Sequence, residues 1–116
     1  MVLENRSTKD VVEHHLAALL SGDVNDILQD YSDNSIVFTP DGPVQGLADL
    51  SSLFTAFLSE LPEGSLAMLE VLREDYNGDA AYLLWSIPGL FPLGTDTFVV
   101  AEGKILTQSF AAYRQE

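Results

Sequence analysis

The fold is decided by the last third of the chain, where residues 77–114 read NGDAAYLLWSIPGLFPLGTDTFVVAEGKILTQSFAAYR. Asn77-Gly78 is a strong signal for a tight β-hairpin, and the apolar run 80–87 predicts its returning strand. Residues 95–101 and 104–114 predict a second hairpin around the turn residues Glu102 and Gly103. Two consecutive hairpins indicate an antiparallel sheet.

The segments before and between these hairpins complete the predicted sheet region. Residues 66–76 are apolar and rich in strand-forming side chains, so they predict the first strand of the first hairpin. Residues 88–94 join the two hairpins, and their two prolines and two glycines favour a connection over a strand.

Helical spacing dominates the first half of the chain. Ser7 followed by Asp10 is typical of a helix start, and apolar residues then recur with helical spacing until Ser21-Gly22, which predicts a helix over 8–21. Asp23 is a suitable cap for a shorter second helix that carries Val24, Ile27, Leu28 and Tyr31 on its apolar side. A third helix begins near Gly46 and ends before Pro62; its apolar stripe consists of Leu47, Leu50, Phe54, Phe57 and Leu61.

A short strand over 35–39 separates the second and third helices, and the turn residues 40–43 end it. Three helices followed by an antiparallel sheet predict an α+β fold whose helices cover one face of the sheet. With 116 residues there is room for a single domain, 1–116, with its core in 8–114.

Composition narrows the function classes. Five Lys and Arg face eighteen Asp and Glu, a net charge of −13 that disfavours nucleic acid and anionic membrane surfaces as partners. Hydrophobic residues make up 47% of the chain, and there is no cysteine, so neither a disulfide framework nor a thiolate metal site is expected. No metal-binding or phosphate-loop motif occurs, and we expect no metal and no cofactor. No secretory signal and no membrane-spanning run is recognisable, which favours a cytoplasmic location.

Four short motifs resemble the nuclear transport factor 2-like superfamily, which includes ketosteroid isomerases and SnoaL-type polyketide cyclases. They are AALLSGD at 17–23, DYSDNSIVF at 30–38, Gly46 at the start of the third helix, and DTFVVAEGKI at 96–105. The resemblance covers about residues 8–114. It implies three helices packed on a strongly curved, mixed sheet that forms a cone with an internal pocket, a cystatin-like α+β barrel. It also implies a homodimer.

The resemblance implies two catalytic candidates. His15 lies on the apolar stripe of the first helix and matches the oxyanion-hole tyrosine of ketosteroid isomerases; without the resemblance it is equally a core histidine. Asp96 matches the protonated, hydrogen-bond-donating aspartic acid of those enzymes and the acid-base aspartate of SnoaL-type cyclases. The neighbouring His14 falls on the polar flank of the helix, where a solvated pair with Asp10 is expected.

Other positions depart from the isomerase pattern. The general-base aspartate is replaced by Thr39, whose hydroxyl has no basic form accessible near neutral pH. The supporting tyrosine of the third helix is replaced by Phe54, whereas Tyr31 matches the tyrosine that follows the second helix. Ordinary ketosteroid isomerase activity is therefore not expected. The predicted pocket residues are completed by Leu83, Trp85, Phe98, Gln108 and Phe110.

These observations leave open whether the protein is an enzyme. One hypothesis is an isomerase, cyclase or lyase that uses His15 and Asp96 on a small, largely apolar carbonyl or hydroxylated molecule. The alternative is a non-catalytic module of the same fold for hydrophobic-ligand binding or dimerisation. The sheet face opposite the helices is predicted to carry Tyr82, Leu84 and Ser86, and its apolar character favours a homodimer.

Overall fold

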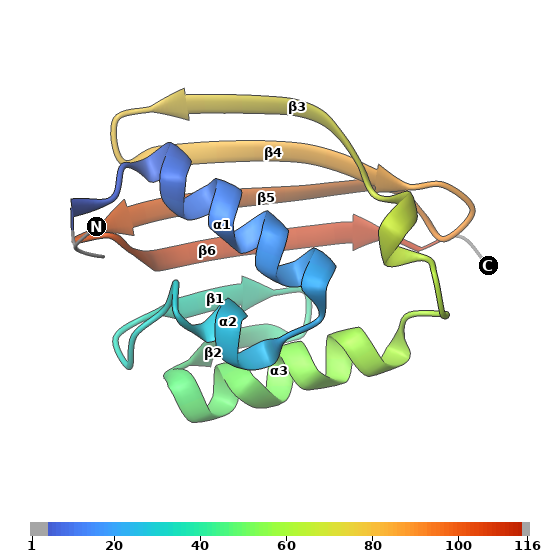
Figure 1. The fold of residues 1–116 in the computed structure, drawn as a ribbon, viewed down its shortest axis with the longest axis horizontal. Helices are drawn as coiled ribbons and strands as arrows, with labels where there is room; N and C mark the ends of the chain where they lie inside the picture. Colours follow the sequence, from blue (N-terminus) through green and yellow to red (C-terminus); the bar gives the residue numbers. More distant parts are fainter. Residues whose placement is uncertain (1–4, 115–116) are drawn as a thin grey trace.

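The computed structural model describes residues 5–114 and shows helices packed on one six-stranded sheet (Figure 1). The helices are α1 (Thr8–Ser21), α2 (Val24–Leu28) and α3 (Leu47–Glu60), followed by a 3-10 turn, η2 (Leu66–Met68). The strands are β1 (Ile36–Thr39), β2 (Gly42–Gln45), β3 (Glu70–Asn77), β4 (Ala80–Ile87), β5 (Phe91–Ala101) and β6 (Lys104–Tyr113). The predicted α+β class is confirmed.

Local sequence signals set the ends of the first two helices. The Ser7 side chain accepts from the backbone of Asp10, and the Asp10 carboxylate accepts from the backbone of Ser7, which forms a complete capping box. Gly22 ends α1 in the left-handed conformation, with φ of 74°, where a side chain would be strained. The Asp23 carboxylate then accepts from the first backbone N–H groups of α2. The predicted helix over 8–21 is therefore confirmed.

The sheet is mixed and open. Its strand order is β2-β1-β6-β5-β4-β3, in which β1 runs parallel to β6 and every other neighbouring pair is antiparallel. Register shifts occur between Trp85 and Ile87 and between Val99 and Val100, and such bulges bend strands and strengthen their twist. The curved sheet keeps two edges, β2 and β3, so the predicted cone does not close into a complete barrel.

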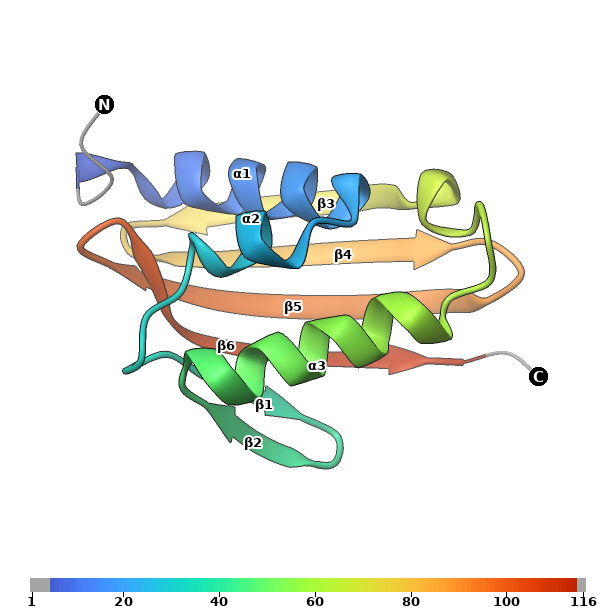
Figure 2. The same ribbon diagram turned by 60° about the horizontal axis from the view of Figure 1, so that its bottom comes forward.

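All three helices lie on the same face of the sheet, with α1 crossing β4 and β5 and with α3 beside β1 and β2 (Figures 1 and 2). Strand side chains such as Leu83, Phe98 and Ile105 are fully buried beneath the helices. Val11 and Leu50 are fully buried on the helix side of the same core. Burial of apolar surface between these two layers stabilises the fold.

Three segments differ from the prediction. Gly42 and Pro43 were expected to belong to the turn over 40–43 but begin the edge strand β2, where a proline is tolerated because an edge residue needs no second partner. The predicted strand over 66–76 begins only at Glu70, because residues 66–68 form η2. The expected connection over 88–94 is shorter, since β5 already begins at Phe91 and pairs with the end of β6.

Among residues 5–114, no helix combines the length and the apolar character that crossing a bilayer requires.

Candidate functional site

A cavity of about 80 Å³ lies between the helices and the sheet. Since one water molecule needs roughly 10–15 Å³, the cavity has room for a small organic molecule. Its apolar wall consists of Leu16, Leu19, Val37, Leu53, Phe54, Phe57, Leu66, Leu69, Ile87 and Phe110. Four other lining residues carry polar atoms: His15, Trp85, Asp96 and Gln108. A mostly apolar wall with a few convergent polar groups is typical of a small-molecule site.

Asp96 is the only acidic residue in the cavity wall described here. It lies within β5, paired with Leu83 on one side and with Phe110 on the other, and is 9% exposed. Burial raises the pKa of Asp96 from its ordinary value of 3.8 to about 7, although the nearby polar side chains of Gln108 and Trp85, which favour the charged carboxylate, oppose this rise. Near neutral pH the carboxyl group is therefore close to half protonated and suited to both donating and accepting a proton.

His15 reaches the cavity from α1 and is 1% exposed. The rings of Phe98, Tyr31 and Phe54 surround it edge to face, with ring centroids 5.5, 5.9 and 6.1 Å away, respectively. Burial, assisted by the charge of His14, lowers the pKa of His15 from 6.5 to about 4. The imidazole is therefore neutral at neutral pH.

A hydrogen-bond chain behind the cavity orients the His15 ring. The Tyr31 hydroxyl donates to Oε1 of Gln108, and the same hydroxyl lies 3.4 Å from Nδ1 of His15. Because the Tyr31 hydrogen is engaged by Gln108, the Tyr31 oxygen is left to accept from Nδ1–H of His15. The neutral His15 ring then carries its lone pair on Nε2, which has no hydrogen-bond partner among the described residues.

Trp85 lies opposite Gly94 in the β4–β5 register, and a side chain at Gly94 would collide with it. A Cβ placed on Gly94 would come within 2.3 Å of the indole ring, so glycine is required for the ring to occupy this position. The indole Nε1 is buried and has no hydrogen-bond partner within residues 5–114. An unpaired buried donor is uncommon and costs about 1–3 kcal/mol.

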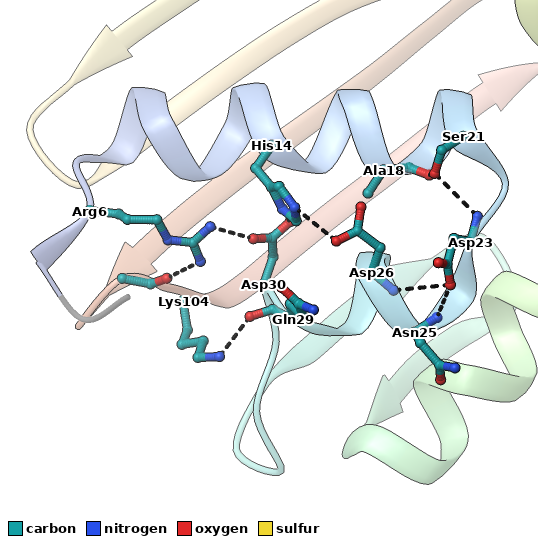
Figure 3. Close-up of polar contacts among 11 residues, drawn as sticks. Arg6, His14, Ala18, Ser21, Asp23, Asn25, Asp26, Gln29, Asp30 and Lys104 are labelled. Carbon is teal, nitrogen blue, oxygen red and sulfur yellow. Dashed lines mark hydrogen bonds and ion pairs between the residues drawn. The ribbon is translucent and has the colours of Figure 1, made fainter. Parts of the chain in front are cut away.

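Outside the cavity, His14 takes part in a charged cluster between the middle of α1 and the α2 region (Figure 3). Its Nδ1 lies 2.6 Å from the carboxylate of Asp30 and its Nε2 lies 3.1 Å from that of Asp26, so the expected pair with Asp10 is wrong. Asp10 is engaged in the capping box instead. Asp30 is fully buried and also pairs with Arg6 at 2.8 Å. The hydrogen bond to Asp30, followed by the charges of Asp30 and Asp26, raises the pKa of His14.

No group of three or more His, Cys, Asp or Glu side chains within residues 5–114 is placed to hold a metal ion.

No protein-family model matches the chain, and no curated protein matches it. Solved structures do match. A protein similar to nuclear transport factor 2, of unknown function and from Burkholderia xenovorans LB400, superposes with a TM-score of 0.75 at 19% identity, covering 94% of this chain and 84% of that one. The chain has the nuclear transport factor 2-like fold.

Two further structures with this fold bear names that suggest small-molecule chemistry. A candidate SnoaL-like polyketide cyclase from Shewanella denitrificans OS-217 matches with a TM-score of 0.72 at 11% identity, covering 91% of this chain and 90% of that one. A candidate hydroxylase from Streptomyces galilaeus matches with a TM-score of 0.71 at 18% identity, covering 91% and 88% of the two chains. At these identities the likeness establishes the fold alone.

Within this nuclear transport factor 2-like fold, six of the ten predicted site residues line the cavity: His15, Phe54, Trp85, Asp96, Gln108 and Phe110. The other four do not. Leu83 and Phe98 are fully buried in the core, and Tyr31 supports His15 and Gln108 from behind. Thr39 is the last residue of β1, and its hydroxyl donates to the carbonyl of Gly42 across the β1–β2 turn at 2.8 Å.

The prediction missed much of the apolar wall. Leu66 and Leu69 were overlooked because their segment was assigned to a strand, whereas Leu66 belongs to η2 and both side chains line the cavity. Leu16 and Leu19 extend the stripe of α1 that already contains His15, so their helical spacing was an available signal.

Proposed function

We propose that this protein binds a small, neutral, largely apolar molecule in its cavity and that Asp96 exchanges a proton with it. The observation that carries the proposal is a single buried carboxyl group, with its pKa raised to about 7, in a wall that is otherwise mainly apolar. A proton-transfer group works best when its pKa lies near the working pH. Isomerisation, cyclisation and elimination next to a carbonyl group are reactions of this class.

In such a step the Asp96 carboxylate takes a proton from a carbon next to the carbonyl group, and the electron pair of that C–H bond moves toward the carbonyl oxygen. The resulting carboxylic acid returns the proton to a different atom of the substrate, so no external oxidant or reductant is needed. His15 enters as a neutral ring whose Nε2 accepts a hydrogen bond from a hydroxyl group of the substrate. It is a positioning group here, because its low pKa makes it a weak base.

The structural neighbours named as a candidate cyclase and a candidate hydroxylase support a small-molecule role for this fold. The open cavity favours this role over a cone that is filled by its own side chains. The alternative is a binding module without catalysis, and the position of Thr39 favours it. Where the isomerase pattern has its general base, this chain has a hydroxyl group that is committed to a turn.

The deciding experiment is a screen of small epoxides, enones and β-hydroxy ketones for conversion by the wild type, Asp96→Asn and Asp41→Asn. Asp41→Asn makes the same chemical change at an exposed turn residue outside the cavity. We expect Asp96→Asn to lower turnover at least 100-fold and Asp41→Asn to leave it unchanged. Turnover that survives Asp96→Asn would refute the role of Asp96. Binding of panel members without any conversion would support the binding module.

A further inference from the structure

The indole nitrogen of Trp85 is the one side-chain nitrogen or oxygen within residues 5–114 that is itself inaccessible to solvent and has no hydrogen-bond partner. Folding removed this donor from water without replacing the lost hydrogen bond, which is unfavourable. The ring lines the cavity, so a molecule bound there is able to supply the missing acceptor. Oε1 of Gln108 already accepts from Tyr31. The indole lies near enough to the Asp96 carboxyl group to lower its pKa, but the two groups form no hydrogen bond.

The position of the indole is tightly defined by the sheet. Of the ring atoms that a Cβ at Gly94 would strike, one is Cε2, the carbon bonded to Nε1, so Gly94 makes room for the N–H edge of the ring. Phe91 packs edge to face against the indole with ring centroids 5.9 Å apart. A donor held this firmly loses little further conformational entropy when it binds a ligand.

The same register places the indole next to Asp96. Leu83 pairs with Asp96 and Trp85 pairs with Gly94, so Trp85 and Asp96 are diagonal neighbours on the cavity-facing side of β4 and β5. Diagonal neighbours of this kind lie within reach of an aromatic side chain. An oxygen atom bound by the indole N–H therefore lies close to the group that the proposed function uses for proton transfer.

We propose that Trp85 is the specificity-determining residue of the cavity and that its Nε1–H donates a hydrogen bond to the carbonyl oxygen of a small, uncharged ketone. This inference rests on the proposed function, because it requires the cavity to bind a small molecule. A carbonyl oxygen fits because the vacant group is a donor only. An uncharged ligand fits because the wall is largely apolar and the chain carries a net charge of −13, which repels anions.

The first test uses the fact that the chain contains one tryptophan, so a proton–nitrogen NMR spectrum contains a single indole resonance that needs no further assignment. The probes are acetophenone and α-methylstyrene, which share a skeleton and differ in having C=O or C=CH₂. We expect both probes to perturb the spectrum and only acetophenone to move the indole proton downfield, as a new hydrogen bond requires. Equal indole shifts with the two probes would overturn the inference.

The second test measures both dissociation constants by calorimetry for the wild type, Trp85→Phe and Phe110→Leu. Trp85→Phe keeps an aromatic ring but removes the N–H, so we expect acetophenone to lose about five-fold in affinity relative to α-methylstyrene. Phe110→Leu alters the apolar wall without removing a donor, so it should leave the ratio of the two constants unchanged. If both probes bind but Trp85→Phe leaves that ratio unchanged, the role of Trp85 is refuted and the proposed function stands. If neither probe binds the wild type, this inference fails, because acetophenone is itself a small, uncharged ketone, and the proposed function is then judged by its own screen.

Discussion

Asp96 and His15 line one cavity, and burial moves the pKa values of the two side chains in opposite directions. Removal from water disfavours the charged form of each group, so the pKa of the acid rises to about 7 and that of the base falls to about 4. Between these two values both groups are predominantly uncharged. The cavity is therefore electrically neutral in mildly acidic solution, which suits a neutral ligand.

Asp96→Asn is expected to stabilise the protein more at pH 8 than at pH 5. Because the pKa of Asp96 is raised from 3.8 to about 7, its contribution to stability is fully present below pH 3.8 and is lost as the pH rises to about 7. About two pKa units of that loss fall above pH 5, so the variant should gain roughly 3 kcal/mol relative to the wild type between pH 5 and pH 8. Urea denaturation at both pH values measures this gain. If the difference in unfolding free energy between the two proteins does not change with pH, the raised pKa of a buried Asp96 carboxyl group is contradicted.

The two histidines are expected to titrate on opposite sides of pH 6.5. The pKa of His14 is raised chiefly by its hydrogen bond to Asp30, whereas that of His15 is lowered to about 4. The stability that His14 contributes is therefore present below pH 6.5 and is lost as the pH rises through its folded-state pKa. An NMR titration should show one histidine signal on each side, and His14→Gln should remove the upper one. Two signals that both titrate near pH 6.5 would contradict the hydrogen bond of His14 to Asp30 and the burial of His15.

At the scale of the elements, the site depends on how neighbouring strands pair. β4 and β5 bring Trp85 over Gly94 and Asp96 beside Leu83, while β6 brings Gln108 opposite Phe98. Two further contacts join α1 to the segment that follows α2. His14 and Asp30 meet in the surface cluster, and the residues that follow them, His15 and Tyr31, meet at the cavity. The charged cluster therefore holds α1 and the segment after α2 in the register that the cavity needs.

Gly94→Ala is expected to displace the Trp85 indole. The added Cβ would lie 2.3 Å from the ring, and relieving such a clash in a packed interior costs about 1–3 kcal/mol. Thermal denaturation should show this loss, and the fluorescence of the only tryptophan should shift in the folded protein. Thr97→Ala, an exposed position on the same strand, is the control and should change neither property. An unchanged emission spectrum in Gly94→Ala would mean that the indole does not lie over this glycine.

At the scale of the whole molecule, the sheet face opposite the helices exposes apolar side chains. Phe38, Val99 and Leu106 are 45%, 38% and 40% exposed, respectively. Of the residues predicted for this face, Tyr82 and Leu84 are half-buried, whereas Ser86 is 9% exposed and adds little to the surface. Exposed apolar groups gathered on one sheet face favour association with a second copy of the chain.

We expect the protein to be a homodimer that associates through this outer sheet face. Val99→Glu places a charge in the face and should give the mass of a monomer by light scattering at micromolar concentration, while the wild type gives the mass of a dimer. Leu20→Glu is the control, because Leu20 is 53% exposed on α1, away from the sheet. A monomeric wild type would contradict the predicted dimer, and a dimeric Val99→Glu would assign the contact to another surface.

The sequence by itself determined the elements whose signals are local. The Ser7 capping box, the Asp23 cap and the turn after Asn77 are each set by residues a few positions apart, so the ends of α1 and the extent of β4 were predictable. The helical stripe predicted that His15 faces inward, and the resemblance to the nuclear transport factor 2-like superfamily implied that His15 and Asp96 share a pocket, which both residues line in the structure. The edge strand β2 was missed because its four residues, which include Pro43, show no alternation and pair only as part of the assembled sheet.

Only the tertiary structure decided which partners the site residues find. His14 bonds to Asp30 across 16 positions of sequence and Tyr31 bonds to Gln108 across 77, and no local pattern encodes either pairing. The same holds for the Trp85 indole, whose N–H remains unpaired because Gly94 lets the ring settle at the cavity wall. Local backbone preferences act over one or two turns of chain, whereas burial and hydrogen bonding depend on residues that only the folded chain brings together.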